Sequence, residues 1–136
     1  MHYNKTLLVV EDEEKLLRTL SDFLTIQGYE ILQASDGQEA LEIFCNNMNK
    51  IDLVLLDIKL PLVNGNEVLN EIRRNSQIPV IMLTANSSVE KQLYSFSQGA
   101  DDYIVKPYTL AVLKAHVEAV LKRAGKMDQF LEAGEL

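Results

Sequence analysis

Apolar residues follow two alternating patterns along this chain. Short, nearly continuous apolar runs alternate with segments in which apolar residues recur every three or four positions. Continuous runs are typical of strands buried on both faces of a parallel sheet, and the longer spacing is typical of amphipathic helices. The runs predict strands at residues 7–10, 29–34, 53–56, 80–83 and 103–105.

The segments between and after these runs predict five helices. The first ends before Gly28, and the second opens at Asp36, where Glu39 three residues later resembles a capping box. Pro61 and the pair Asn64-Gly65 indicate a loop before the third helix, which ends near Asn75. The last two helices are expected at about 88–97 and 109–123. Five β/α units with a parallel sheet covered on both faces are therefore expected.

Polar side chains follow four of the apolar runs, at the point where each run ends. They are Glu11-Asp12, Asp57, Thr84 and Lys106. In an open parallel sheet, ligands bind outside the carboxyl ends of the strands. Three carboxylates, a hydroxyl and an ammonium group are therefore expected to meet at one small site. This chemistry suits a divalent cation and a phosphoryl group.

Composition narrows the class of protein further. The chain has 136 residues, enough for one domain, and its net charge of -7 argues against nucleic-acid binding by this chain alone. No apolar run approaches the ~18 residues that span a membrane. The start of the chain lacks the apolar core of a signal peptide. One cysteine excludes an internal disulfide, and a cytoplasmic location without a membrane partner is expected.

Four sequence motifs together resemble the receiver domain of two-component response regulators. The resemblance covers roughly residues 5–124 in the right order and spacing. It rests on Glu11-Asp12, on Asp57 with Pro61 and Gly65, on Leu83-Thr84-Ala85, and on the block from Gly99 to Tyr108. The Gly-Ala-Asp-Asp-Tyr part of that block resembles the subfamily whose receivers precede a winged-helix DNA-binding domain. The resemblance implies a flavodoxin-like α/β fold with strand order 2-1-3-4-5 and five helices.

The resemblance also implies a role for each site residue. Asp57 would be the phosphoacceptor, taking a phosphoryl group from a sensor histidine kinase, while Lys106 neutralises charge. Thr84 would donate its hydroxyl, and the backbone amide of Ala85 would be a further donor. Mg²⁺, or Mn²⁺ or Ca²⁺ in its place, would be held by the residues of one group: Asp12, Asp57, the backbone carbonyl of Lys59 and, through water, Glu11. The Lys106-Pro107 bond resembles the family's cis peptide.

The switch and the dimer surface follow from the same resemblance. Thr84 and Tyr103 would be the switch residues, with Tyr103 turning inward in the active state. The changed surface would be the helix at 88–97, the strand at 103–105 and the helix at 109–123, through which the subfamily forms a homodimer. The candidate contacts there are Lys91, Asp101, Asp102, His116 and Arg123. Ala111 stands where a glutamate is usual and His116 where an arginine is usual, so at least two interface ion pairs should be missing or weakened.

The expected domain boundaries are 1–124 for the receiver and 125–136 for a tail or the start of a linker. The chain is then either the receiver of a larger transcription regulator, with DNA binding in an absent output domain, or a stand-alone receiver acting through protein partners. It is expected to be a signalling domain with only weak self-phosphorylation and self-dephosphorylation.

Three functions from other classes remain as alternatives. A phosphatase with an aspartyl nucleophile usually has an acid two residues after it, where this chain has Lys59. A nucleotide- or flavin-binding domain needs a glycine-rich turn after the first strand, where four acidic residues stand instead. A receiver-like module that is never phosphorylated typically loses part of the site that this chain keeps.

Overall fold

The computed structural model describes residues 5–85, 93–94 and 97–132, with residues 126–132 as backbone only. Its centre is one sheet of five parallel strands in the order β2-β1-β3-β4-β5. The strands are β1 (Thr6–Val10), β2 (Glu30–Ala34), β3 (Leu53–Asp57), β4 (Val80–Thr84) and β5 (Asp102–Val105). The predicted parallel sheet and its strand order are confirmed.

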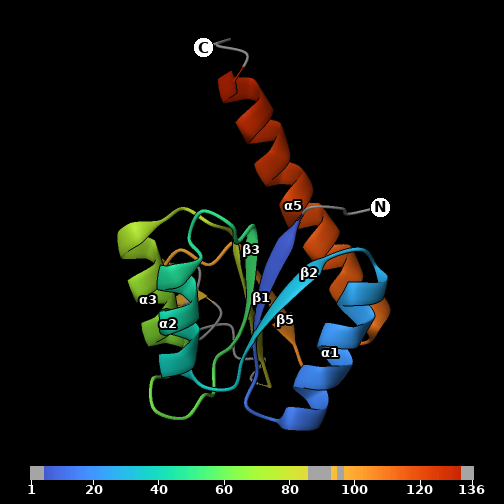
Figure 1. The fold of residues 1–136 in the computed structure, drawn as a ribbon, viewed down its shortest axis with the longest axis vertical. Coiled ribbons are helices and arrows are strands. Elements are labelled where there is room, and N and C mark those ends of the chain that lie inside the picture. The colour runs from blue at the N-terminus through green and yellow to red at the C-terminus, as the bar shows by residue number, and fades with distance from the viewer. Residues whose placement is uncertain (1–4, 86–92, 95–96, 133–136) are drawn as a thin grey trace.

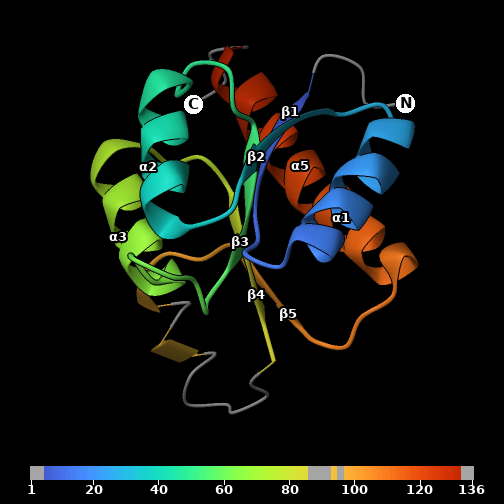
Figure 2. The ribbon, with the colours of Figure 1, turned by 60° about the horizontal axis from the view of Figure 1, so that its bottom comes forward.

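Helices cover both faces of this sheet (Figures 1 and 2). The helices assigned over the described residues are α1 (Glu14–Ile26), α2 (Gly37–Asn46), α3 (Gly65–Asn75) and α5 (Leu110–Glu132). Helices α1 and α5 lie on one face, and α2 and α3 lie on the other. The helix expected at 88–97 falls mostly outside the described residues, although Leu93, Tyr94 and Ser97 are helical.

The predicted ends of two helices are formed by local hydrogen bonds and by a glycine. The Asp36 carboxylate accepts a hydrogen bond from the backbone N–H of Glu39 at 2.7 Å, which caps α2. Glu39 in turn accepts from the backbone N–H of Ser35, the residue before the cap, at 2.8 Å, so the chain entering α2 is also held in place. Gly28, at φ 103°, follows α1 in a conformation that side chains rarely adopt.

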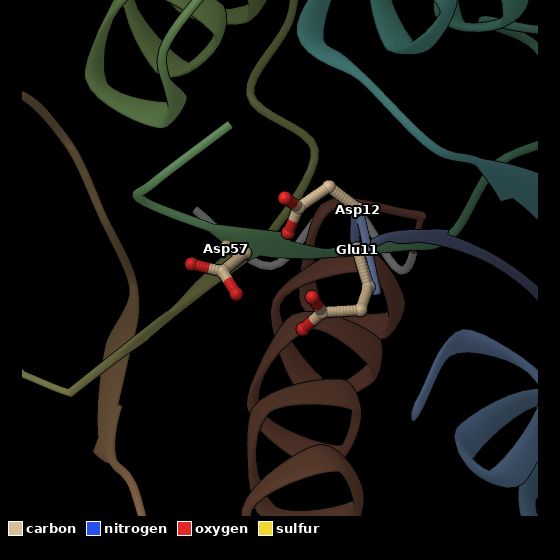
Figure 3. A group of neighbouring side chains, drawn as sticks. All are labelled: Glu11, Asp12 and Asp57. Carbon is tan, nitrogen blue, oxygen red and sulfur yellow. The ribbon is translucent and has the colours of Figure 1, made fainter. Parts of the chain in front are cut away.

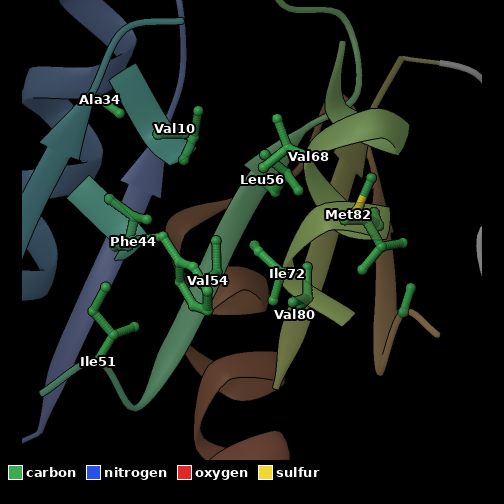
Figure 4. Packing of buried hydrophobic residues seen from close by; sticks show 14 of the residues in the cluster. Val10, Ala34, Phe44, Ile51, Val54, Leu56, Val68, Ile72, Val80 and Met82 are labelled. Atoms are coloured by element: carbon green, nitrogen blue, oxygen red, sulfur yellow. The ribbon is translucent and has the colours of Figure 1, made fainter. Parts of the chain in front are cut away.

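The core consists of two layers, one on each face of the sheet. Alternate residues of β1, for example, point to opposite layers, because successive side chains of a strand face opposite ways. Val10, Leu56 and Met82 pack under α2 and α3 with Phe44 and Ile72 (Figure 4). The other layer is formed by residues of α1, α5 and the strands: Leu7, Val9, Leu20, Leu24, Leu55, Leu83, Leu113, Val117 and Val120. Two buried layers hold the strand ends in fixed positions.

Helix α5 is longer than its sequence pattern predicted. It continues to Glu132, whereas the expected end lay at Arg123. Gly125 does not stop it, because the residues around it favour helix and none of them is proline. The last turns extend beyond the body of the domain (Figure 1). No helix in the described part of the chain is long and apolar enough to cross a membrane.

Candidate functional site

The polar residues singled out in the sequence meet at the carboxyl edge of the sheet. Asp57 is the last residue of β3 and Thr84 the last of β4, while Glu11 and Lys106 directly follow β1 and β5. The register places these strand ends side by side, with Val10 opposite Leu56 and Asp57 opposite Leu83. Parallel pairing of neighbouring strands therefore brings together residues that are far apart in sequence.

Three carboxylates face one another at this edge (Figure 3). One oxygen from each of Glu11, Asp12 and Asp57 lies within 4.8 Å of the others. Glu11 and Asp57 are buried, with 2% and 4% of their surface exposed, whereas Asp12 is exposed. The cluster therefore has two buried acids at its base and one acid open to solvent.

Lys106 is the cation of this group. Its Nζ donates to Asp57 Oδ2 at 2.5 Å and to Glu11 Oε1 at 3.2 Å. Its backbone N–H donates to the Thr84 carbonyl at 2.6 Å, so the chain after β5 is fixed to the end of β4. The peptide bond between Lys106 and Pro107 is cis, as the sequence resemblance implied.

Backbone donors orient both buried acids. Glu11 Oε2 accepts from the N–H of Glu13 at 3.1 Å, and Asp57 Oδ1 accepts from the N–H of Lys59 at 3.0 Å. Each carboxylate therefore has one oxygen on a backbone amide and the other on the Lys106 ammonium. This arrangement fixes the direction of both side chains without a bound ligand.

The environment shifts the proton affinity of two of these groups. Burial raises the pKa of Glu11 from 4.5 to about 7, and the nearby Asp57 carboxyl adds to this rise. The Glu13 amide and the Lys106 charge act in the opposite direction. Burial alone would lower the pKa of Lys106, but its hydrogen bonds and charge interactions with Asp57 and Glu11 outweigh burial and raise it. The Lys106 ammonium therefore stays charged at neutral pH.

Two glycines allow the loop after β3 to approach its neighbours closely. A Cβ on Gly65 would lie 2.3 Å from the Asp57 carbonyl oxygen, and one on Gly37 would lie 1.8 Å from the Val63 carbonyl oxygen. The Gly65 N–H also donates to the Ile58 carbonyl at 2.7 Å. The sequence motif included Gly65 without a physical role for it, and the contact of Gly37 had no local sequence signal.

The donor set fits a magnesium ion. Mg²⁺ takes oxygen ligands and is usually bound by one or two carboxylates, with water and phosphate completing the shell. Glu11, Asp12 and Asp57 carry up to three negative charges against one from Lys106, which leaves as many as two for a divalent cation to balance. The exposed position of Asp12 leaves the cluster open to an ion from solvent.

The two predicted switch residues lie next to this cluster and in the core. Thr84 is buried at 4% exposure, and Ala85, directly after it, is exposed. Tyr103 is also buried, at 8% exposure, and packs in the layer that contains Met82 and Ala100. The inward orientation expected of Tyr103 in an active state is therefore already the one described here.

Three of the candidate dimer contacts, Asp101, Asp102 and His116, are engaged within the chain. Asp101 pairs with Arg73 of α3 at 2.7 Å, and Asp102 Oδ2 lies 2.6 Å from Nδ1 of His116 on α5. Arg123 is exposed near the end of α5. Ala111 is exposed near its start, and Lys91 lies outside the described residues.

Comparisons with known proteins agree with this arrangement. The family model described as response regulator receiver domain matches residues 7–118. The "Probable transcriptional regulator ycf27" of Porphyridium aerugineum is 42% identical over 120 residues, which are 88% of this chain and 49% of that protein. The chain thus spans about half the length of this curated relative.

Solved structures give the same result. A response regulator receiver domain protein from Clostridium thermocellum matches with a TM-score of 0.84 and 31% identity, over 90% of this chain and 98% of that one. A chain from the CheX-CheY-BeF3-Mg complex of Borrelia burgdorferi matches with a TM-score of 0.81 and 30% identity, over 85% and 88% of the two chains. Fold, site and sequence agree, and the chain belongs to the family of response regulator receiver domains.

Proposed function

We propose that Asp57 accepts a phosphoryl group and that the resulting aspartyl phosphate changes the surface of the domain. The observation that carries this proposal is the cluster itself. A buried carboxylate held by one amide and one ammonium lies at the carboxyl edge of the sheet, beside two further acids. A solvated acidic loop would not need a half-buried lysine that contacts two of its members.

Asp57 acts as the nucleophile in this proposal. One of its carboxylate oxygens attacks phosphorus, the bond from phosphorus to the donor's imidazole nitrogen breaks, and that nitrogen leaves with the bonding electron pair. Phosphoryl transfer depends on positioning and on neutralising charge rather than on covalent help. Lys106 supplies a fixed positive charge within hydrogen-bonding distance of Asp57, and the raised pKa keeps that charge in place.

A magnesium ion supports the reaction by supplying further positive charge. Asp12 and Asp57 are the proposed direct ligands, with the backbone carbonyl of Lys59, and Glu11 is proposed to act through a bound water. Glu11 suits an indirect role because it is buried at 2% exposure and both of its oxygens are engaged, one by the Glu13 amide and one by Lys106. The solved Borrelia burgdorferi relative was crystallised in a complex that contains Mg²⁺. Mn²⁺ and Ca²⁺, which also accept oxygen ligands, are proposed substitutes.

Thr84 and Ala85 are proposed to bind the new phosphoryl oxygens. The Thr84 hydroxyl and the Ala85 backbone N–H are donors at the end of β4, the strand next to Asp57. Phosphorylation adds about 1.5 to 2 negative charges, which would draw these donors inward. Tyr103, on the next strand, packs against β4 residue Met82 in the same layer, so a shift of β4 would change its packing.

The proposed phosphodonor is a sensor histidine kinase, and the proposed output is transcription control by a DNA-binding domain beyond the receiver. This follows from the relative named as a probable transcriptional regulator. We place the receiver at residues 1–124 and the start of a linker at 125–136, with α5 crossing that boundary. We also propose a homodimer through the helix expected at 88–97, β5 and α5, in which Asp101 and Asp102 would have to exchange the partners that they have within the chain.

The test is intact-mass spectrometry after incubation with acetyl phosphate, with and without Mg²⁺. A gain of one phosphoryl group is expected only with Mg²⁺, and Asp57→Asn should remove it. Asp52→Asn is the matched control, because Asp52 lies before β3 and accepts from the Thr6 N–H at the opposite end of the sheet. Labelling that survives unchanged in Asp57→Asn would disprove the assigned nucleophile. No labelling by acetyl phosphate or by histidine kinases would favour a module that is never phosphorylated.

A further inference from the structure

A cleft lies at the end of the sheet opposite the acidic cluster, where α5 leaves the body. Its volume is about 620 Å³. Ile51, Ile78 and Pro79 line it from loops that lead into β3 and β4, and Val120 and Ala124 line it from α5. These side chains give the cleft an apolar patch on each side, and polar residues, among them Ser76 and Gln77, complete its lining.

The charges at the rim of this cleft are unequal once internal contacts are considered. Asp52 Oδ2 accepts from the Thr6 N–H at 2.7 Å, and Asp101 Oδ2 accepts from Arg73 at 2.7 Å. The two cations, Lys5 and Arg123, are exposed and form no ion pair among the described residues. Because Arg73 offsets Asp101, the two cations exceed the remaining carboxylate, that of Asp52, by one charge, and the cleft favours a segment with a net negative charge.

The extension of α5 at residues 126–132 has these properties. Along α5, Leu113, Val117 and Val120 are buried against the sheet. In the sequence, this alternating spacing of four and three residues continues at Ala124, Met127 and Leu131. The same segment contains two acids, Asp128 and Glu132, and one cation, Lys126, so its net charge is -1. Isolated helical turns are unstable without packing, so an extension beyond the body needs a partner surface.

We propose that the cleft binds residues 126–132 of a second copy of this chain, reciprocally, in a two-fold symmetric dimer. The chain's own extension cannot reach its own cleft, because α5 is one continuous helix that runs outward from it. The two extensions must be antiparallel. In a parallel pair, the partner's α5 would lie along the face of α5 that carries Leu113 and Val117. The chain's own sheet already covers that face, so the partner's helix would collide with the sheet.

Electrostatics favour the antiparallel arrangement. It brings the carboxyl end of the partner's helix, with its partial negative charge, toward Lys5 and Arg123. Two identical contacts related by a two-fold axis form a closed dimer and leave no open end. The extension spans only about 10 Å, so the interface is small and the dimer weak.

Disulfide trapping in a mixture of two variants tests this arrangement. Both variants carry Cys45→Ser, because Cys45 is exposed. One also carries Gln77→Cys at the cleft, and the other carries Glu132→Cys on the extension. A cross-linked dimer is expected in the mixture and not in either variant alone. Gln38→Cys, exposed at the opposite end of the sheet, replaces Gln77→Cys in the control mixture and should not cross-link.

Charge reversal provides a second, independent test by sedimentation equilibrium. Arg123→Glu should weaken the dimer at least several-fold, and adding Glu132→Lys should restore part of the loss. Acetyl phosphate labelling should stay unchanged in both variants, because both positions lie far from Asp57. A monomer at all concentrations without cross-links in the mixture would overturn the proposal. Cross-linking of Glu132→Cys with itself alone would overturn the antiparallel arrangement.

Discussion

Glu11 is the site residue whose charge depends most on pH near neutrality. Its pKa rises from 4.5 to about 7 on folding, so the folded protein holds this proton more tightly than the unfolded chain does. The extra stability from this group is present below pH 4.5 and is lost as the pH rises through about 7. At higher pH the buried Glu11 is charged, and this lowers the free energy of unfolding.

We expect Glu11→Gln to reduce this pH dependence in the absence of metal. Between pH 5 and pH 8, the wild-type free energy of unfolding should lose about 1–2 kcal/mol more than that of the variant. Urea unfolding at the two pH values measures the difference. Glu14→Gln, on the exposed first turn of α1, is the control. Equal pH dependence of wild type and Glu11→Gln would show that Glu11 titrates normally.

A second prediction for a single residue concerns Gly65. We expect Gly65→Ala to lower the free energy of unfolding by about 1–3 kcal/mol and to slow labelling of Asp57. The reason is that the new Cβ would lie 2.3 Å from the Asp57 carbonyl oxygen, so the backbone of the phosphoacceptor must move. Gly125→Ala is the control, since a Cβ there meets nothing within 4 Å. Chemical denaturation and labelling rates are the measurements, and an unchanged labelling rate would argue against the coupling.

Between elements, Arg73 connects the end of α3 to the two loops that lead into β4 and β5. Its guanidinium donates to the Gly99 carbonyl at 2.9 Å, the Ile78 carbonyl at 2.7 Å and the Asp101 carboxylate at 2.7 Å. Asp101 also accepts from the Val80 N–H at 2.8 Å, at the start of β4. Hydrogen bonds to charged groups contribute more than neutral ones, so one side chain stabilises three neighbouring segments.

We expect Arg73→Ala to lower the free energy of unfolding by about 2–4 kcal/mol, because three acceptors lose a partly buried, charged donor. Arg74→Ala should cost less than about 0.5 kcal/mol, because Arg74 is exposed and its ion pair in the described part of the chain is with Glu71, one turn away. Thermal and urea unfolding measure the free-energy change in both variants. Labelling of folded Arg73→Ala should persist, since Arg73 lies away from the acidic cluster. If Arg73→Ala lowered the free energy of unfolding as little as Arg74→Ala, the hydrogen bonds of Arg73 would contribute little to stability.

For the whole molecule, magnesium binding should be linked to stability. A ligand that binds only the folded state raises the free energy of unfolding by about 1.4 kcal/mol at ten times its dissociation constant. We expect Mg²⁺ to raise the melting temperature of the wild type and not of Asp12→Ala. In the absence of metal, Asp12→Ala should be at least as stable as the wild type, because one of three neighbouring negative charges is removed.

Calorimetry of both proteins, with and without Mg²⁺, tests this linkage. Ca²⁺ and Mn²⁺ serve as comparison ions, and K⁺ at equal ionic strength is the control for screening. A large fall in the melting temperature of metal-free Asp12→Ala, with Mg²⁺ stabilisation retained, would show that the acidic pair is structural.

Much of this fold was determined by local sequence patterns. The continuous apolar runs defined the strands, and Asp36 with Glu39 defined the start of α2, because strand burial and helix caps depend on residues close in sequence. The positions of Asp57, Thr84 and Lys106 at strand ends were also predicted, and parallel strands bring such ends to one edge of the sheet. The residues that meet at this edge were therefore predictable as a set.

The tertiary structure alone decided which distant groups meet. Nothing in the sequence around Arg73 shows that it reaches Asp101, or that His116 reaches Asp102, because these contacts depend on how α3, α5 and β5 are placed. Burial of Glu11 and its raised pKa likewise follow from the packing around it. Sequence patterns record local periodicity and residue type, whereas the contact of two remote side chains depends on the whole packed core.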